Sequence, residues 1–316
     1  MSRYESQLPP AGRFAPAPTG DLHAGHLLTA GLAWASARCQ GVRFILRLED
    51  LDAPRTQPGS AEKILATLAR AGLDWDEDWL RGGPCDPYRQ SERTARYRAA
   101  LEKLRAANRV YPCACSRAEI SLSAPHGPEG PVYPGLCREL APEKTLARCV
   151  ELKRPPAWRF RVRPGLVEFT DGARGVQSDE PEKTTGDFVV ARGDSFSYQL
   201  AVVVDDAAMG VREVLRGGDL LGSTARQILL YEALNRPAPK FVHGPVLANS
   251  SGVKLSKRDQ ALSADTLLEK WGIDFWPKLC AALLPENTRK TSGGREALFA
   301  LAERLPSLPV SAKLSL

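Results

Sequence analysis

Two short polar motifs, more than two hundred residues apart, carry the side chains in this chain that are best suited to chemistry. His23–His26 (HAGH) follows a Pro-Thr-Gly turn, and Lys254–Lys257 (KLSK) follows Ser251–Gly252. Two imidazoles at the start of a helix and two ammonium groups on a loop suit the negative charge that builds when a carboxylate attacks the α-phosphate of ATP. Each motif alone is weak evidence, but the two in this order predict one ATP site. Its predicted catalytic residues are His23, His26, Lys254 and Lys257.

The residues around the first motif predict a βαβ unit. Residues 12–16 can form a buried strand, residues 24–40 have the apolar spacing of a helix, and residues 42–48 alternate as a second strand. The free N–H groups and the dipole at the start of such a helix favour a bound phosphate. The residues expected to bind ATP are Thr19, Gly20, His23, Gly25, His26, Lys254, Ser256 and Lys257. A simpler alternative is that both histidines only cap or cover the helix.

Composition indicates the broad class of the protein. With 316 residues and a net charge of +6, the chain suits about two domains and is mildly basic, which permits a nucleic-acid partner without requiring one. No N-terminal apolar run resembles a signal peptide, and no stretch of about eighteen apolar residues occurs, so neither secretion nor a membrane span is expected. The seven cysteines form no regular framework, which favours a reducing cytoplasm and metal binding over disulfide bonds.

The rest of the chain predicts further elements. Helices are expected at residues 60–71, 91–108, 220–235, 264–271 and 295–305, strands at 157–163, 188–191, 196–204 and 241–247, and a turn at 249–252. Proline and glycine are dense in residues 112–156, so little regular structure is expected there. In the strand at 157–163, Arg159, Arg161 and Arg163 share one face, where they either contact phosphates or face water.

With these elements placed, the chain resembles the catalytic half of the glutamyl-tRNA synthetases, which are class I enzymes. The resemblance extends from about residue 10 to about residue 265. The matching stretches are residues 13–20, 23–26, 47–52, 54–55, 197–206, 216–221 and 254–258. Ala24 replaces the isoleucine of the family, and Leu255 and Arg258 replace a methionine and a serine, but the phosphate-facing side chains remain. Within the family, the chain is most similar to the glutamyl-queuosine tRNA(Asp) synthetases.

The resemblance implies a site for free glutamate, and the charges of its residues suit that ligand. Arg13 and Arg216 can each offer a bidentate fork to a carboxylate, Glu49 can pair with the ammonium, and Tyr198 offers a hydroxyl and a ring wall. The residues implied to bind glutamate are Arg13, Phe14, Ala15, Pro16, Ala17, Glu49, Tyr198 and Arg216. Each also has an ordinary structural interpretation, such as the end of a strand for Glu49 or sheet packing for Tyr198.

Three cysteines surround a glycine-rich loop that is poor in core residues. Cys113, Cys115 and Cys137 suit a structural zinc ion, which prefers sulfur ligands in a tetrahedron. His126 and Tyr133 are both candidates for the fourth ligand, and the family resemblance selects Tyr133. The alternative is that the three cysteines are reduced structural residues.

We expect an α/β protein of the class I Rossmann fold, with a zinc-holding insertion and a short helical tail. The expected divisions are residues 1–110 and 187–258 for the Rossmann halves, 111–186 for the insertion and 259–316 for the tail. Only 59 residues follow Lys257, whereas an anticodon-binding domain needs about a hundred.

The resemblance therefore implies ATP-dependent activation of glutamate, with Mg²⁺, and transfer to the queuosine of tRNA(Asp) rather than to a 3′-terminal ribose. The protein is expected to be a cytoplasmic monomer with no membrane partner. The rival hypotheses are a truncated or partner-assisted glutamyl-tRNA synthetase and a non-catalytic RNA-binding protein with the same fold.

Overall fold

The computed structural model describes most of the chain. The described residues are 8–123, 126–127, 130–248, 263–281, 283, 294 and 296–313. The Lys254–Lys257 motif and the expected turn at 249–252 lie outside them, and the side chain of His126 is not described.

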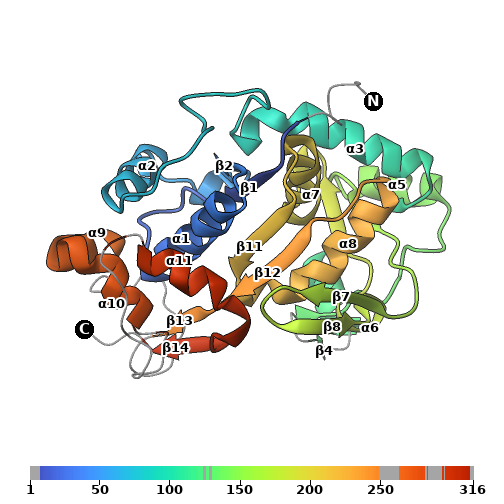
Figure 1. The fold of residues 1–316 in the computed structure, drawn as a ribbon. Coiled ribbons are helices and arrows are strands. Elements are labelled where there is room, and N and C mark those ends of the chain that lie inside the picture. Colours follow the sequence, from blue (N-terminus) through green and yellow to red (C-terminus); the bar gives the residue numbers. More distant parts are fainter. Residues whose placement is uncertain are drawn as a thin grey trace.

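A parallel sheet lies at the centre of the molecule (Figure 1). Its strands are β1 (Ala11–Phe14), β2 (Arg43–Leu46), β11 (Glu213–Gly217) and β12 (Lys240–Gly244). β1 pairs with β2 and β11 with β12, and a parallel bridge between Ala11 and Val211 joins the two pairs in the order β2-β1-β11-β12. Helix α1 (Ala24–Cys39) connects β1 to β2, which confirms the predicted βαβ unit.

Two apolar cores cover this sheet. One contains α1 together with the C-terminal helices, and the other contains α3, α7 and α8. The helices of the first core are α1, α2 (Ser60–Arg70), α9 (Ala264–Trp271), α10 (Phe275–Ala281) and α11 (Glu296–Glu303). Those of the second are α3 (Thr94–Ala106), α7 (Tyr198–Met209) and α8 (Thr224–Ala233). The expected helix at 264–271 is confirmed, and β13 (Val246–Ala248) pairs in parallel with β14 (Ser311–Lys313).

An antiparallel sheet of order β10-β9-β6-β3 stands beside the parallel one. Its strands are β3 (Val110–Cys113), β6 (Ala157–Phe160), β9 (Val189–Arg192) and β10 (Ser195–Phe196). Between them lie α4 (Arg117–Ser123), β4 (His126–Gly127), β5 (Gly130–Pro131), α5 (Pro142–Glu151), β7 (Val167–Asp171), β8 (Gly175–Asp179) and α6 (Pro181–Thr184). The expectation of little regular structure in residues 112–156 is wrong for α4 and α5. In α5, Pro142 occupies the first helical turn, where proline is tolerated.

The prediction of a strand at residues 196–204 is also wrong. Only Ser195–Phe196 is a strand, and α7 begins at Tyr198. Ser197 caps the helix by accepting a hydrogen bond from the backbone N–H of Leu200, and Gly210 ends it in the left-handed conformation. The apolar run at 200–203 is buried, and an apolar run inside a core does not distinguish a strand from a helix by its periodicity.

Three smaller differences have local causes. The helix expected at 220–235 begins at Thr224, after a 3₁₀ turn at Gly218–Ser223, and Pro245 separates β12 from β13. The arginines of 157–163 do not form an exposed row: Arg159 is buried and donates to the backbone carbonyl of Asp187, and its guanidinium lies 3.6 Å from the centre of the Tyr133 ring.

None of the described helices is both long and apolar enough to cross a membrane.

Gly31 shows how closely the C-terminal helices pack on α1. A Cβ added there would lie 2.7 Å from Cη2 of Trp276 and 2.9 Å from Cδ2 of Leu298. The Trp276 ring cannot move freely, because its Nε1 donates to the carbonyl of Ala71. The contact places α10 and α11 in the same core as α1, the helix that begins with the histidine motif.

We predict that Gly31→Ala lowers the free energy of unfolding by about 1–3 kcal/mol, the cost of overpacking a core. Glycine-to-alanine changes inside a helix ordinarily stabilise by about 0.5–1 kcal/mol, so the sign of the effect is diagnostic. Urea unfolding of the two proteins measures it. An increase in stability would show that the helices after residue 263 do not pack on α1 in this way.

Candidate active site

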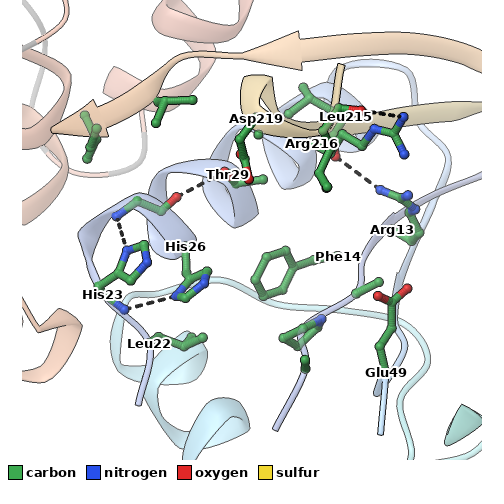
Figure 2. Close-up of a pocket in the computed structure, with 18 of the residues that line it drawn as sticks. Arg13, Phe14, Leu22, His23, His26, Thr29, Glu49, Leu215, Arg216 and Asp219 are labelled. Atoms are coloured by element: carbon green, nitrogen blue, oxygen red, sulfur yellow. Dashed lines mark hydrogen bonds between the residues drawn. The ribbon is translucent and has the colours of Figure 1, made fainter. Parts of the chain in front are cut away.

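A pocket of about 390 Å³ opens at the carboxyl ends of β1 and β11 and at the start of α1. Predicted residues that line it are Arg13, Phe14, Ala15, Pro16, Ala17, Thr19, His23, Gly25, His26, Glu49, Tyr198 and Arg216. Figure 2 shows His23 and His26 on one side of the pocket and Arg13 and Glu49 on the other. Gly20 does not line it and instead exchanges hydrogen bonds with the hydroxyl of Ser60. The KLSK residues lie outside the described part of the chain.

The two histidines form a capping box at the start of α1. Nδ1 of His23 accepts from the backbone N–H of Gly25 at 3.1 Å, and Nδ1 of His26 accepts from the backbone N–H of His23 at 3.2 Å (Figure 2). The rings stack with their centres 3.7 Å apart. Because both Nδ1 atoms are acceptors, each neutral ring carries its proton on Nε2. Both histidines therefore do cap the helix, and the same bonds make each Nε2 a donor.

A buried charge cluster forms the other side of the pocket. Nε and Nη2 of Arg13 each lie 3.4 Å from a carboxylate oxygen of Asp206, and Nη1 donates to the carbonyl of Leu215. Arg47 is fully buried, and its guanidinium contacts Asp206 at 2.6 Å and Glu49 at 3.2 Å. The cluster joins β1, the end of β2 and α7, and it directs Arg13 and Glu49 toward the pocket.

Two carboxylates in this cluster have opposite pKa shifts. Burial raises the pKa of Glu49, and Arg47 and Arg13 only partly offset it. Burial also acts to raise the pKa of Asp206, but the Coulomb attraction of Arg13 and Arg47 outweighs it and the pKa is lowered. Asp206 is therefore held firmly ionised, whereas an ionised Glu49 lacks enough positive charge in its surroundings.

Arg216 lies on β11 and is held by neutral groups. Its Nε donates to Nε2 of His243 at 2.9 Å, Nη1 to Gln227 at 2.7 Å and Nη2 to the hydroxyl of Thr224 at 2.9 Å. His243 in turn shares a 2.6 Å hydrogen bond between Nδ1 and Asp171. This series of hydrogen bonds keeps the proton of His243 on Nδ1 and fixes the orientation of the Arg216 guanidinium.

Burial lowers the pKa of Arg216. Its described hydrogen bonds all go to uncharged acceptors, so the side chain brings a nearly uncompensated positive charge to the wall of the pocket. A buried guanidinium of this kind favours an anionic ligand.

Sequence reasoning did not assign roles to Arg47, Asp206, Asp171 or His243. Arg47 and Asp206 lie within the stretches that match the family, which was the available signal. His243 is a single histidine in an apolar strand, a pattern more typical of a core residue. Further lining residues that were not predicted are Leu22, Thr29, Leu215, Gly217, Asp219, Leu220, Pro245, Val246 and Leu247.

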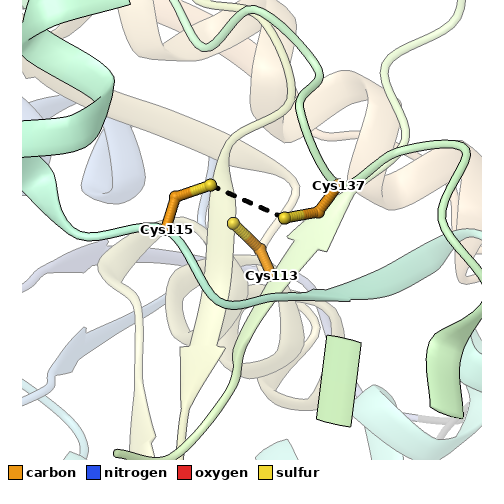
Figure 3. A group of neighbouring side chains, drawn as sticks. All are labelled: Cys113, Cys115 and Cys137. Carbon is orange, nitrogen blue, oxygen red and sulfur yellow. Dashed lines mark hydrogen bonds between the residues drawn. The ribbon is translucent and has the colours of Figure 1, made fainter. Parts of the chain in front are cut away.

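The three predicted cysteines also come together. The sulfur atoms of Cys113, Cys115 and Cys137 all lie within 4.8 Å of one another, and those of Cys115 and Cys137 are 3.5 Å apart (Figure 3). The hydroxyl of Tyr133 is 3.4 Å from Sγ of Cys113 and 3.8 Å from Sγ of Cys115. Zinc–sulfur bonds of about 2.3 Å in a tetrahedron place sulfurs about 3.8 Å apart, so the cluster fits zinc with little adjustment.

The hydrogen bond from the Cys137 thiol lowers the pKa of Cys113 to about 4, although burial opposes the shift. The thiolate is the form that binds metals.

Comparisons with known proteins agree with this fold. Residues 11–283 match the family described as tRNA synthetases class I (E and Q), catalytic domain. A glutamyl-Q tRNA(Asp) synthetase of Symbiobacterium thermophilum is 54% identical over 257 residues, which make up 80% of this chain and 79% of that protein. Another, from Geobacter sulfurreducens, is 48% identical over 261 residues, or 81% of this chain and 78% of that protein.

A solved structure supports the same family. The crystal structure of a glutamate tRNA ligase from Elizabethkingia meningosepticum, in complex with its amino acid, has a TM-score of 0.79 and 27% identity. The match covers 97% of this chain and 67% of that one. This chain therefore belongs to the class I tRNA synthetases of the E and Q type. It is an enzyme of the ligase class, and its family resemblance is confirmed.

The opposite pKa shifts predict opposite effects of two amide substitutions on stability. Asp206 has a pKa in the folded protein below its unfolded value of about 3.9. Its ionised carboxylate therefore stabilises the folded state at pH 7, and this stabilisation is lost as the pH falls. Asp206→Asn should therefore lower the free energy of unfolding by about 3 kcal/mol at pH 7. Glu49 has a folded pKa above about 4.3, so its ionised form opposes folding at pH 7. Glu49→Gln should leave the stability equal or higher.

Urea unfolding at pH 7 and at pH 4 measures both effects. The two variants serve as controls for each other, because each replaces a carboxylate by an amide beside Arg47. The difference in free energy of unfolding between the two variants should be smaller at pH 4 than at pH 7. A destabilising Glu49→Gln would contradict the burial cost assigned to that carboxylate.

Proposed function

We propose that this protein uses ATP to activate glutamate as glutamyl-adenylate and then transfers the glutamyl group to the queuosine of tRNA(Asp). The observation that carries the proposal is a single pocket with donors for a phosphate on one side and an arginine pair with a carboxylate on the other. An amino acid bound between Arg13 and Glu49 would place its reacting carboxylate near a phosphate held by the histidines.

On the amino-acid side, the charges match glutamate. The ligand carries two carboxylates and one ammonium, and Arg13, Arg216 and Glu49 supply the complementary charges. Asp206 already neutralises much of the charge of Arg13, whereas Arg216 has only uncharged partners among its described hydrogen bonds. We therefore assign the side-chain carboxylate, which distinguishes glutamate from glutamine, to Arg216 with the hydroxyl of Tyr198 beside it.

On the ATP side, the histidines act as oriented donors. Their Nδ1 atoms accept from backbone N–H groups, so each Nε2 carries the proton that would be donated to the α-phosphate as the carboxylate attacks. Thr19, Gly20 and Gly25 belong to the same turn and helix start. We assign Lys254, Ser256 and Lys257 to the triphosphate, with Mg²⁺ as its companion ion.

The acceptor is inferred from the relatives. The two curated proteins described above are named for glutamyl-Q tRNA(Asp), and both are at least 48% identical to this chain over most of its length. We infer a cytoplasmic, monomeric enzyme, with Rossmann halves at residues 1–110 and 187–258, an insertion at 111–186 and a tail at 259–316. The second candidate is a glutamyl-tRNA synthetase, which the likeness to a glutamate tRNA ligase favours.

We also propose that one zinc ion holds the insertion. Cys113, Cys115 and Cys137 would bind it, and the Tyr133 hydroxyl would complete the site. The zinc would have a structural role, because a site with four protein ligands leaves no open position for a reactant.

We predict that radiolabelled glutamate is transferred to tRNA(Asp) from cells that make queuosine and not to tRNA(Asp) from cells that cannot. Glutamate alone should support ATP–pyrophosphate exchange, whereas glutamine should be poor, because it leaves the charge of Arg216 unpaired. Labelling of tRNA(Glu) instead would favour the second candidate. Absence of exchange with either amino acid would contradict the catalytic proposal.

We predict one zinc per chain by elemental analysis of freshly purified protein. Cys115→Ser should lose the metal and increase hydrogen exchange in residues 112–140, while Cys39→Ser, at an exposed cysteine, should keep it. His126→Ala should also keep it. Loss of zinc from His126→Ala would replace Tyr133 by His126 as the fourth ligand, and a metal-free wild type would contradict the site.

A further inference from the structure

A second pocket, of about 210 Å³, lies beside the first one and shares no lining residue with it. It is lined by Phe169, Gln177, Ser178, Asp179, Thr184, Thr185, Leu221, Gly222 and Ala225. The 3₁₀ turn at Gly218–Ser223 separates the two pockets: its Asp219 and Leu220 line the first, and its Leu221 and Gly222 line the second.

The lining suits a flat heterocycle with hydrogen-bonding edges. Phe169 supplies an aromatic ring, and Leu221 and Ala225 supply apolar surface. Around them are a carboxylate, an amide and three hydroxyls. The Thr184 hydroxyl donates to Oδ1 of Asp179, and the Gln177 amide nitrogen donates to the carbonyls of Arg174 and Val176. The carboxylate of Asp179 can accept further N–H groups from a base edge, and the hydroxyls of Ser178 and Thr185 can donate to its carbonyls. Aromatic stacking combined with edge contacts is how proteins recognise unstacked bases in single-stranded RNA.

The hairpin that forms one wall is firmly held relative to the first pocket. Asp171, at the end of β7, accepts from the backbone N–H groups of Ala173 and His243 and shares a hydrogen bond with Nδ1 of His243. His243 holds Arg216 of the first pocket at 2.9 Å. Figure 1 shows β7 and β8 beside α6 and α8. The two pockets therefore share a connected frame of buried side chains.

We propose that the second pocket binds an unstacked nucleobase of the acceptor RNA, with the ring on Phe169 and its N–H groups toward Asp179. This inference rests on the proposed function, because it requires an acceptor nucleoside at the first pocket. The base is either that of the acceptor nucleoside itself or that of one of its two neighbours in the chain. Each of the three is a flat heterocycle with hydrogen-bonding groups along its edge.

The test compares two isosteric charge changes on one hairpin. Asp179→Asn removes the acceptor charge in the pocket, and Glu168→Gln removes the same charge from an exposed residue of β7 that does not line it. Asp179→Asn should raise KM for the RNA about tenfold, the loss expected for one hydrogen bond to a charged group. Glu168→Gln should leave KM unchanged or lower, because fewer negative charges favour RNA binding in general. Glutamate-dependent pyrophosphate exchange should stay unchanged in both.

Phe169→Leu is the second variant and should raise KM at least about fivefold through lost stacking. Anticodon stem-loops with an abasic nucleotide on either side of the acceptor identify the base. If one abasic RNA raises KM for the wild type and removes the effect of Asp179→Asn, that neighbour occupies the pocket. If neither abasic RNA changes KM for the wild type, while Asp179→Asn still raises KM, the base in the pocket is that of the acceptor nucleoside.

Two kinds of failure are distinguishable. A wild type that charges RNA, with KM unchanged in both Asp179→Asn and Phe169→Leu, would overturn the second pocket and leave the proposed function standing. A wild type that performs no glutamate exchange would overturn the proposed function itself. If Phe169→Leu lost exchange as well, the packing of Phe169 against Phe241 would explain it, and Asp179→Asn would decide alone.

Discussion

The buried contact between Arg47 and Asp206 is the interaction on which the candidate site depends. Arg47 is fully enclosed, and a buried guanidinium is tolerated only where carboxylates face it. Asp206 on α7 supplies that partner at 2.6 Å and also holds Arg13, so α7 must dock against β1 and β2 for the cluster to be neutral. Glu49 completes the cluster at a cost in stability, as the raised pKa of its carboxyl indicates. Binding sites commonly retain groups of this kind, because a ligand's ammonium can supply the charge that the empty site lacks.

The opposite side of the pocket uses backbone hydrogen bonds instead of charge. His23 and His26 cap α1 through Nδ1, and that same geometry decides which nitrogen of each ring carries the proton. Structural and chemical interpretations of the motif are therefore not alternatives. The helix start needs acceptors for its first N–H groups, and imidazoles that meet this need become oriented donors.

A third layer of polar contacts connects the site to the rest of the molecule. Arg216 is oriented by His243, and His243 by Asp171, which lies at the end of the β7–β8 hairpin. All three side chains are buried, so each hydrogen bond is costly to leave unmade. The hairpin thereby fixes both an arginine in the first pocket and a wall of the second. Cys113, Cys115 and Cys137 pack with Tyr111, Tyr133 and Ala157 in a small core of their own.

The sequence alone determined the features that depend on local spacing. The βαβ unit, the helix at Ala264–Trp271, the two histidines and the three cysteines could all be predicted, because periodicity, capping and short motifs act over a few residues. The side chains at the Arg13 end of the pocket were implied by the family resemblance instead. The tertiary structure alone decided that α7 is a helix, that Arg159 is buried, and that Arg47, Asp206, Asp171 and His243 support the pocket. Arg47 meets Asp206 across 159 positions, and Asp171 meets His243 across 72. No local pattern records such pairs, because their partners are chosen by the packing of distant elements and by the cost of burying a charge or a hydrogen-bonding group without one.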